Sequence, residues 1–181
     1  PPPPGFLDLA DQYGIYVVGE AEIECHQYPR LADDRRWRPA FLDRVRKMVL
    51  RDRNHASILF WSAGNESDNG ENLAAVIEEG KRLDPARPFW MYGGNIFMSP
   101  FEDIVGPRYW EPFQLQMLAE QSLEEDARPS FMDEYLCNAG NGLGGLDDYW
   151  ELIYRYPRLS GGAIWEWVNQ GLEMPVNLLD D

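Results

Sequence analysis

Short apolar runs alternate with longer amphipathic stretches along this chain. The runs are rich in β-branched and aromatic residues and too short for buried helices, so they predict strands covered on both faces. The predicted strands are Ile15–Val18, Ser57–Trp61, Phe89–Tyr92, Asp103–Val105, Ser130–Met132 and Ala163–Val168. Between them, apolar residues at helical spacing predict helices at Pro39–Asp52, Glu71–Leu83, Phe113–Leu123 and Leu146–Tyr154.

This alternation predicts an α/β fold with a parallel sheet, of which a (β/α)₈ TIM barrel is the best match. A doubly wound open sheet would show the same pattern, but no Gly-rich phosphate loop follows any predicted strand. The chain opens abruptly at Pro1–Pro4 and closes at Leu178–Asp181 without an obvious finishing element, so we interpret it as part of a longer protein.

The composition narrows the functional classes. A formal net charge of −15 leaves no basic face, which argues against nucleic acid or an anionic membrane as a partner. No apolar run approaches the ~18 residues of a transmembrane helix. The cysteines, Cys25 and Cys137, form no disulfide framework, and reduced thiols favour a cytoplasmic location.

Carboxylates and a histidine follow the first predicted strand. If the chain stays extended there, Glu22, Glu24 and His26 share one face, because alternate residues of a strand point the same way. A divalent cation would offset the cost of grouping them, and carboxylate ligands suit Mg²⁺. The alternative is that Glu22 is solvated and His26 hydrogen-bonds to backbone.

Two further carboxylates suit the cleavage of a glycosidic bond. Asn65 and Glu66 follow the second strand, where an amide can donate to a sugar hydroxyl while the acid protonates the departing oxygen. Glu134 follows the fifth strand and could attack the anomeric carbon. The alternatives are that Asn65–Glu66 caps the next helix and that Glu134 pairs with an arginine. Trp165 and Trp167 share a face of the last strand, where one could stack on a sugar ring, but core packing is the better expectation for each.

Several segments in family order resemble glycoside hydrolase family 2, and within it the bacterial β-galactosidases. They are "YGIYVVGEAEIECH", "RDRNHASILFWSAGNES", "DPARPFWMYGGN", "DEYLCNAGNGLGG" and "YPRLSGGAIWEWVNQGL". The resemblance implies that residues 1–181 are part of a catalytic TIM barrel, from about strand 3 to strand 8. It also implies a retaining β-glycosidase that cleaves terminal β-galactosides through a covalent glycosyl-enzyme.

The resemblance assigns roles to individual residues. It implies Glu66 as the acid/base and Glu134 as the nucleophile. The implied ligands of an active-site Mg²⁺ are Glu24, His26 and Glu66. The implied sugar contacts are Asn65, Tyr109, Trp165 and, where the family usually has histidine, Cys137.

Cys137 keeps the identity of the sugar open, because a thiol is smaller than imidazole and a poorer hydrogen-bond donor. A β-glucuronidase or another β-glycosidase of the family is therefore an alternative, as is a carbohydrate-binding barrel without turnover. A metal-dependent hydrolase using Glu24 and His26 would need more nitrogen ligands than the chain offers. The expected partners are a β-galactoside or related oligosaccharide, the N-terminal domains of the same protein, and copies of the chain in a homo-oligomer.

Overall fold

The computed structural model of the chain describes residues 2–67, 69–90, 101–138, 142, 144–166 and 171. Two sets of parallel strands form the centre of the fold. Strands β1 (Val17–Glu20), β2 (Ile58–Ser62) and β3 (Phe89–Trp90) pair in that order, and β4 (Ser130–Tyr135) pairs with β5 (Leu159–Ile164). A single parallel bridge between Val105 and Ser130 adds the segment before α4 to the second set.

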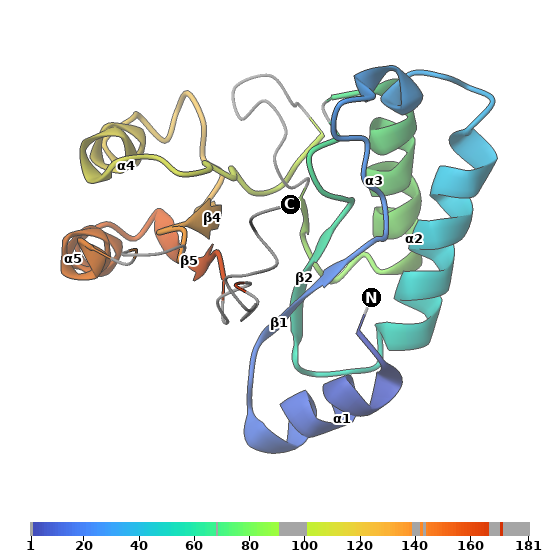
Figure 1. The fold of residues 1–181 in the computed structure, drawn as a ribbon, viewed down its shortest axis with the longest axis horizontal. Coiled ribbons are helices and arrows are strands. Elements are labelled where there is room, and N and C mark those ends of the chain that lie inside the picture. Colours follow the sequence, from blue (N-terminus) through green and yellow to red (C-terminus); the bar gives the residue numbers. More distant parts are fainter. Residues whose placement is uncertain are drawn as a thin grey trace, which may run out of the picture.

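Helices flank these strands on two opposite sides. Helices α2 (Arg38–Asp52) and α3 (Glu71–Leu83) cover the β1–β2–β3 sheet, and α4 (Pro112–Ala119) and α5 (Leu146–Arg155) lie beyond β4 and β5 (Figure 1). Helix α1 (Pro4–Tyr13) packs at one end, and the 3₁₀ turn η1 (Pro29–Ala32) precedes α2. The arrangement confirms the predicted alternation of parallel strands and helices as part of a TIM barrel, which the described strands do not close.

The helices follow directly from the apolar pattern. Phe41, Val45 and Met48 are buried on one face of α2, and Val76 and Ile77 are buried on α3. These faces join the strands in one core, and a second core forms between α5 and the β4–β5 pair. Among the described residues, every helix is too short or too polar to cross a bilayer.

The strand boundaries differ from the prediction at both ends of the chain. Helix α1, which the apolar pattern did not predict, ends at Gly14 with φ 69°, and the next two residues connect it to β1 with exposed side chains. Strand β1 therefore begins at Val17 rather than Ile15. The predicted strand at Asp103–Val105 is reduced to the single bridge at Val105.

The last strand begins four residues earlier than predicted. Gly161 and Gly162, interpreted as a boundary, lie inside β5, which ends at Ile164. The predicted strand is therefore wrong at Trp165 and Glu166, and its last two residues, Trp167 and Val168, fall outside the described residues. A Cβ atom on Gly162 would lie 2.8 Å from the Cβ of Met132 in β4. The glycine therefore allows the two strands to approach closely. A prediction that treats glycine as the end of a strand does not detect this role.

Candidate active site

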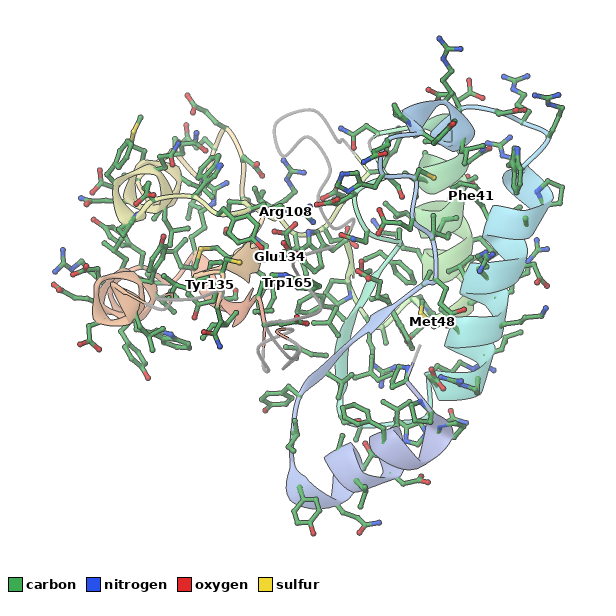
Figure 2. The ribbon with its side chains drawn as sticks, viewed as in Figure 1. Phe41, Met48, Arg108, Glu134, Tyr135 and Trp165 are labelled. Carbon is green, nitrogen blue, oxygen red and sulfur yellow. The ribbon has the colours of Figure 1, made fainter. Side chains whose placement is uncertain are left out.

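Polar side chains gather where β1, β2 and β4 end. A cavity of about 680 Å³ opens there, and Figure 2 shows Arg108, Glu134 and Trp165 in the middle of the view, between the two sets of strands. Its lining residues are Glu20, Ala21, Glu22, Ile23, Glu24, Asn65, Asp133, Glu134, Ala163, Ile164, Trp165 and Glu166. The carboxyl ends of parallel barrel strands form this edge, which is where the sequence places the chemistry.

The loop after β2 is held tightly against the extension of β1. The N–H of Asn65 donates to the carbonyl of Ile23 at 2.8 Å, and Ser67 Oγ donates to the Asn65 carbonyl at 2.7 Å. Glu66 takes a positive φ of 41°, an uncommon backbone conformation for a non-glycine residue. Helix α3 begins only at Glu71, after Gly70. Asn65 and Glu66 therefore do not cap this helix, and the capping alternative is wrong.

Glu24, His26 and Glu66 form a compact group at the rim. One candidate ligand atom from each lies within 4.8 Å of the others, and His26 Nδ1 contacts Glu66 Oε2 directly. Asn65 Nδ2 donates to the second oxygen of Glu24 at 2.5 Å. Glu22 lies with them on the exposed side of the same segment and lines the cavity, but its carboxylate lies 3.9 Å from Arg44 and is not part of this group. The three side chains therefore share a face as expected, but only Glu24 and His26 belong to the compact group with Glu66.

Glu134 lies in β4 with 7% of its surface exposed. Its carbonyl accepts from the N–H of Tyr109 at 2.8 Å, and its own N–H donates to Asp133 Oδ1 at 2.7 Å. Burial, together with the negative charges of Glu20, Glu24 and Glu166, raises the pKa of Glu134 to about 7. Within the described part of the chain no cation pairs with Glu134, so the predicted alternative of an arginine ion pair is not observed.

Glu20 is a second carboxyl with a raised pKa, and burial is the main cause. Ser62 Oγ donates to Glu20 Oε2 at 2.8 Å, which opposes the effect of burial by stabilising the ionised form. The residue ends β1 and lines the cavity beside Glu134. Glu20 therefore adds negative charge at the position where a nucleophile would have to ionise.

Arg108 connects the two sides of the site. Its guanidinium donates to Glu66 Oε1, to Asn65 Oδ1 at 3.1 Å and to Asp133 Oδ1 at 3.4 Å. The side chain is 18% exposed, and that of Asp133 is fully buried. One side chain from the segment before α4 thus contacts residues that follow β2 and a residue within β4.

The remaining candidate sugar contacts are more exposed. Trp165 has 42% of its surface exposed and lines the cavity, so the expectation that it is core packing is wrong. Tyr109 is also 42% exposed. Its pKa is raised by partial burial and by the electrostatic effect of the nearby Cys137 side chain. Cys137 itself is exposed and free. Trp167, the second tryptophan of the predicted strand, lies outside the described residues.

Comparison with known proteins identifies the family. Residues 1–180 match the family described as glycosyl hydrolases family 2, TIM barrel domain. The chain belongs to this family. It is 41% identical over 183 residues to the β-galactosidase of Vibrio vulnificus strain YJ016, and 42% identical over 179 residues to that of Leuconostoc mesenteroides subsp. mesenteroides.

The family 2 match concerns a limited part of these relatives. The alignments cover 93% and 92% of the chain but 18% and 17% of the two β-galactosidases, so the chain spans less than a fifth of their length. Solved structures agree on the fold alone. A β-D-glucuronidase of Dictyoglomus thermophilum superposes with a TM-score of 0.69 at 21% identity, over 96% of this chain and 37% of that one.

A second solved structure is a family 2 β-galacturonidase of Eisenbergiella tayi bound to galacturonate. It superposes with a TM-score of 0.66 at 21% identity, over 90% of this chain and 35% of that one. Because these two structures are named for different sugars, the shared barrel does not define the sugar that this family 2 chain would bind.

Two residues of this family 2 site were missed by the sequence analysis. Arg108 is 42 positions from Glu66 on the loop after β2, and Glu20 is 42 positions from Ser62 in β2, the residues with which they form hydrogen bonds. The available signal was a charged residue at or just after each predicted strand, which is common at barrel strand ends. The pattern marks such positions but does not show which partner each charge has.

Proposed function

We propose that this chain carries the acid/base and the nucleophile of a retaining β-galactosidase. The observation that carries the proposal is the meeting of Asn65–Glu66 and Glu134 at one edge of the barrel, with Arg108 joining Glu66 to the residue preceding Glu134. Identity of 41–42% to two β-galactosidases supports galactose as the sugar. A pair of carboxyl groups ~5–5.5 Å apart is typical of the retaining mechanism.

In the proposed reaction, the carboxylate of Glu134 attacks the anomeric carbon and forms a glycosyl–enzyme ester. Glu66 donates its proton to the glycosidic oxygen as the bond to the leaving group breaks. Glu66, now ionised, then takes a proton from water, and the resulting hydroxyl displaces Glu134 from the anomeric carbon. Galactose leaves with retained configuration, and both carboxyl groups return to their starting states.

The group of Glu24, His26 and Glu66 fits a divalent cation, and we propose Mg²⁺. Two hard carboxylate oxygens and one ring nitrogen lie within 4.8 Å of one another, and carboxylate ligands with water completing the coordination suit Mg²⁺. Bound there, Mg²⁺ would supply positive charge beside Glu24, one of the groups that raise the pKa of Glu134. Glu24 and His26 also orient Asn65 and Glu66 directly, because Glu24 accepts a hydrogen bond from Asn65 and His26 contacts the carboxylate of Glu66.

The cavity favours a neutral sugar. Its lining includes Glu20, Glu24 and Glu166, whose charges would repel the carboxylate of a uronic acid. In this proposal Asn65 and Tyr109 would supply polar contacts to the sugar, and the exposed ring of Trp165 suits stacking on a sugar face. Cys137 would contribute only a weak donor at its position, so a neutral sugar other than galactose is the second candidate.

The test is covalent labelling of the full natural polypeptide with 2,4-dinitrophenyl 2-deoxy-2-fluoro-β-galactoside. The fluorine slows hydrolysis of the glycosyl-enzyme, so one equivalent of label should be found on the peptide that contains Glu134. The control is Glu134→Gln, which should remain folded and take no label. A label on another residue contradicts the nucleophile assignment. Absence of label from an enzyme that is labelled by the glucosyl analogue contradicts the choice of galactose.

A further inference from the structure

Arg108 is the only described side chain for which hydrogen bonds to Asn65, Glu66 and Asp133 are all observed. Asn65 and Glu66 lie on the loop after β2, whereas Asp133 lies inside β4 directly before Glu134. These two strands do not pair with each other within the described residues. The guanidinium therefore forms a direct polar link between two parts of the site that the backbone ladder does not join.

The backbone of Arg108 belongs to the β4 side of this link. Val105 forms a parallel bridge with Ser130, and the N–H of Tyr109 donates to the carbonyl of Glu134 at 2.8 Å. These two contacts hold the segment that carries Arg108 against β4 on both sides of the arginine. Its side chain then reaches across to the loop after β2.

Asp133 serves as the anchor. Its side chain is fully buried, and it accepts from Arg108 Nε at 3.4 Å and from the N–H of Glu134 at 2.7 Å. A buried carboxylate is costly without a cation and hydrogen bonds, so Asp133 and Arg108 stabilise each other. With Nε directed to Asp133, the two Nη atoms of the planar fork are directed to Glu66 and Asn65.

We propose that Arg108, anchored by Asp133, is a positioning residue that sets the orientation of Asn65 and Glu66 relative to Glu134. The inference rests on the proposed function, because it assumes that Glu66 transfers the proton. The planar guanidinium is required for this role, since an ammonium group has no fixed fork with which to reach three acceptors in three directions.

The test compares Arg108→Met and Arg108→Lys with the natural enzyme on aryl β-galactosides whose leaving groups differ in pKa. A misplaced Glu66 matters only where the leaving group needs a proton. We expect kcat/KM to fall about 100-fold for poor leaving groups, the cost of a displacement near 1 Å, and only a few-fold for the dinitrophenyl substrate. Both variants should still take the 2-fluoro label on Glu134 at close to the natural rate.

The matched control is Arg128→Met. Arg128 is also partly buried and pairs with Asp126 at 2.8 Å, but it precedes β4 at the end away from the site. Its loss should leave the dependence on the leaving group unchanged. Asp133→Asn is the second test variant if the Arg108 variants fail to fold. It removes the charge of the anchor while keeping its shape, and should steepen the same dependence.

The outcomes separate the two proposals. The inference is overturned if kcat/KM of Arg108→Met depends on the leaving group as in the natural enzyme. Where the Arg108 variants do not fold, the same result in Asp133→Asn overturns it. A natural dependence on the leaving group in Arg108→Lys also overturns the inference, because a positive charge without the planar guanidinium would then suffice. An equal loss on every substrate with slow labelling also overturns it, since Arg108 would then act on Glu134 or on sugar binding. If the natural enzyme takes no label on Glu134, the proposed function itself has failed.

Discussion

Glu134 has an environment that opposes its ionisation. Its pKa is raised from the ordinary 4.5 to about 7 by burial and by three neighbouring carboxylates. A carboxyl whose folded pKa lies above its unfolded value favours folding only while it is protonated. This contribution is complete below pH 4.5 and is lost as the pH rises through about 7. In the proposed reaction Glu134 must nevertheless be ionised, so the same carboxylates should limit activity at low pH.

Glu20→Gln tests this electrostatic coupling. Removing the Glu20 charge should lower the pKa of Glu134, because that charge is the largest contribution after burial. The rising acidic limb of kcat/KM reports the free enzyme and should follow the ionisation of Glu134. In Glu20→Gln it should move to lower pH. Glu22→Gln is the control, since Glu22 pairs with Arg44 and is not among the groups that shift Glu134. An unmoved limb, or an equal shift in the control, contradicts the coupling.

At the scale of single residues, the sequence predicts the positions of the site residues better than it predicts their interaction partners. The strand-end positions of Glu66, Glu134, Glu24 and His26 follow from short apolar runs and the polar residues after them. Long-range partners do not follow, because Arg108 meets Glu66 across 42 positions. A charge that is neutralised in space cannot be distinguished from a solvated one by pattern alone.

At the scale of elements, α2, α3 and α5 follow from the sequence better than the strands do, whereas α1 is not predicted and α4 ends at Ala119 rather than Leu123. Helix α3 has its predicted bounds, Glu71–Leu83, because its apolar period and the Asp84–Pro85 stop agree. Strand β5 does not, because Gly162 lies within it to allow close contact with Met132. A glycine that ends an element and a glycine that permits close packing look the same in a sequence.

Gly80 shows the second role in α3, and its substitution is informative. A Cβ atom there would lie 2.2 Å from the ring of Phe89, which is fully buried and stacked on Trp61 at 6.3 Å. Gly80→Ala should therefore lower the free energy of unfolding by about 1–3 kcal/mol, the usual cost of overpacking. Gly5→Ala in α1 meets nothing within 4 Å and should raise the free energy of unfolding by about 0.4–1 kcal/mol, because alanine restricts the unfolded chain.

Urea unfolding of both variants measures these changes. Adding Phe89→Leu to Gly80→Ala should recover part of the loss, because the smaller side chain makes room for the new methyl group. A Gly80→Ala variant as stable as the natural protein would show that Phe89 moves aside freely.

At the scale of the whole molecule, the fold and the site use different parts of the chain. Two separate cores support the two sets of strands. Phe60 and Trp90 meet Phe131 edge-to-face, with ring centroids 5.2 and 5.8 Å away, and so connect the β1–β2–β3 sheet to β4. The proposed metal ligands contribute to neither core, since Glu24 and His26 are exposed at the rim.

Removal of Mg²⁺ should therefore reduce activity without unfolding the protein. We expect thorough chelation to lower kcat/KM at least about tenfold, because losing only a hydrogen-bond partner of a metal ligand commonly costs 10–100-fold and removing the ion should cost no less. The loss of stability is limited to the metal's binding free energy, about 1.4 kcal/mol at ten times its Kd. Glu24→Gln is the matched variant: it should resemble the chelated enzyme and respond little to chelator. A rate that is unchanged by chelation and by added Mg²⁺ would remove the metal from the mechanism. Unfolding on chelation would mean that the residues at the rim support the fold after all.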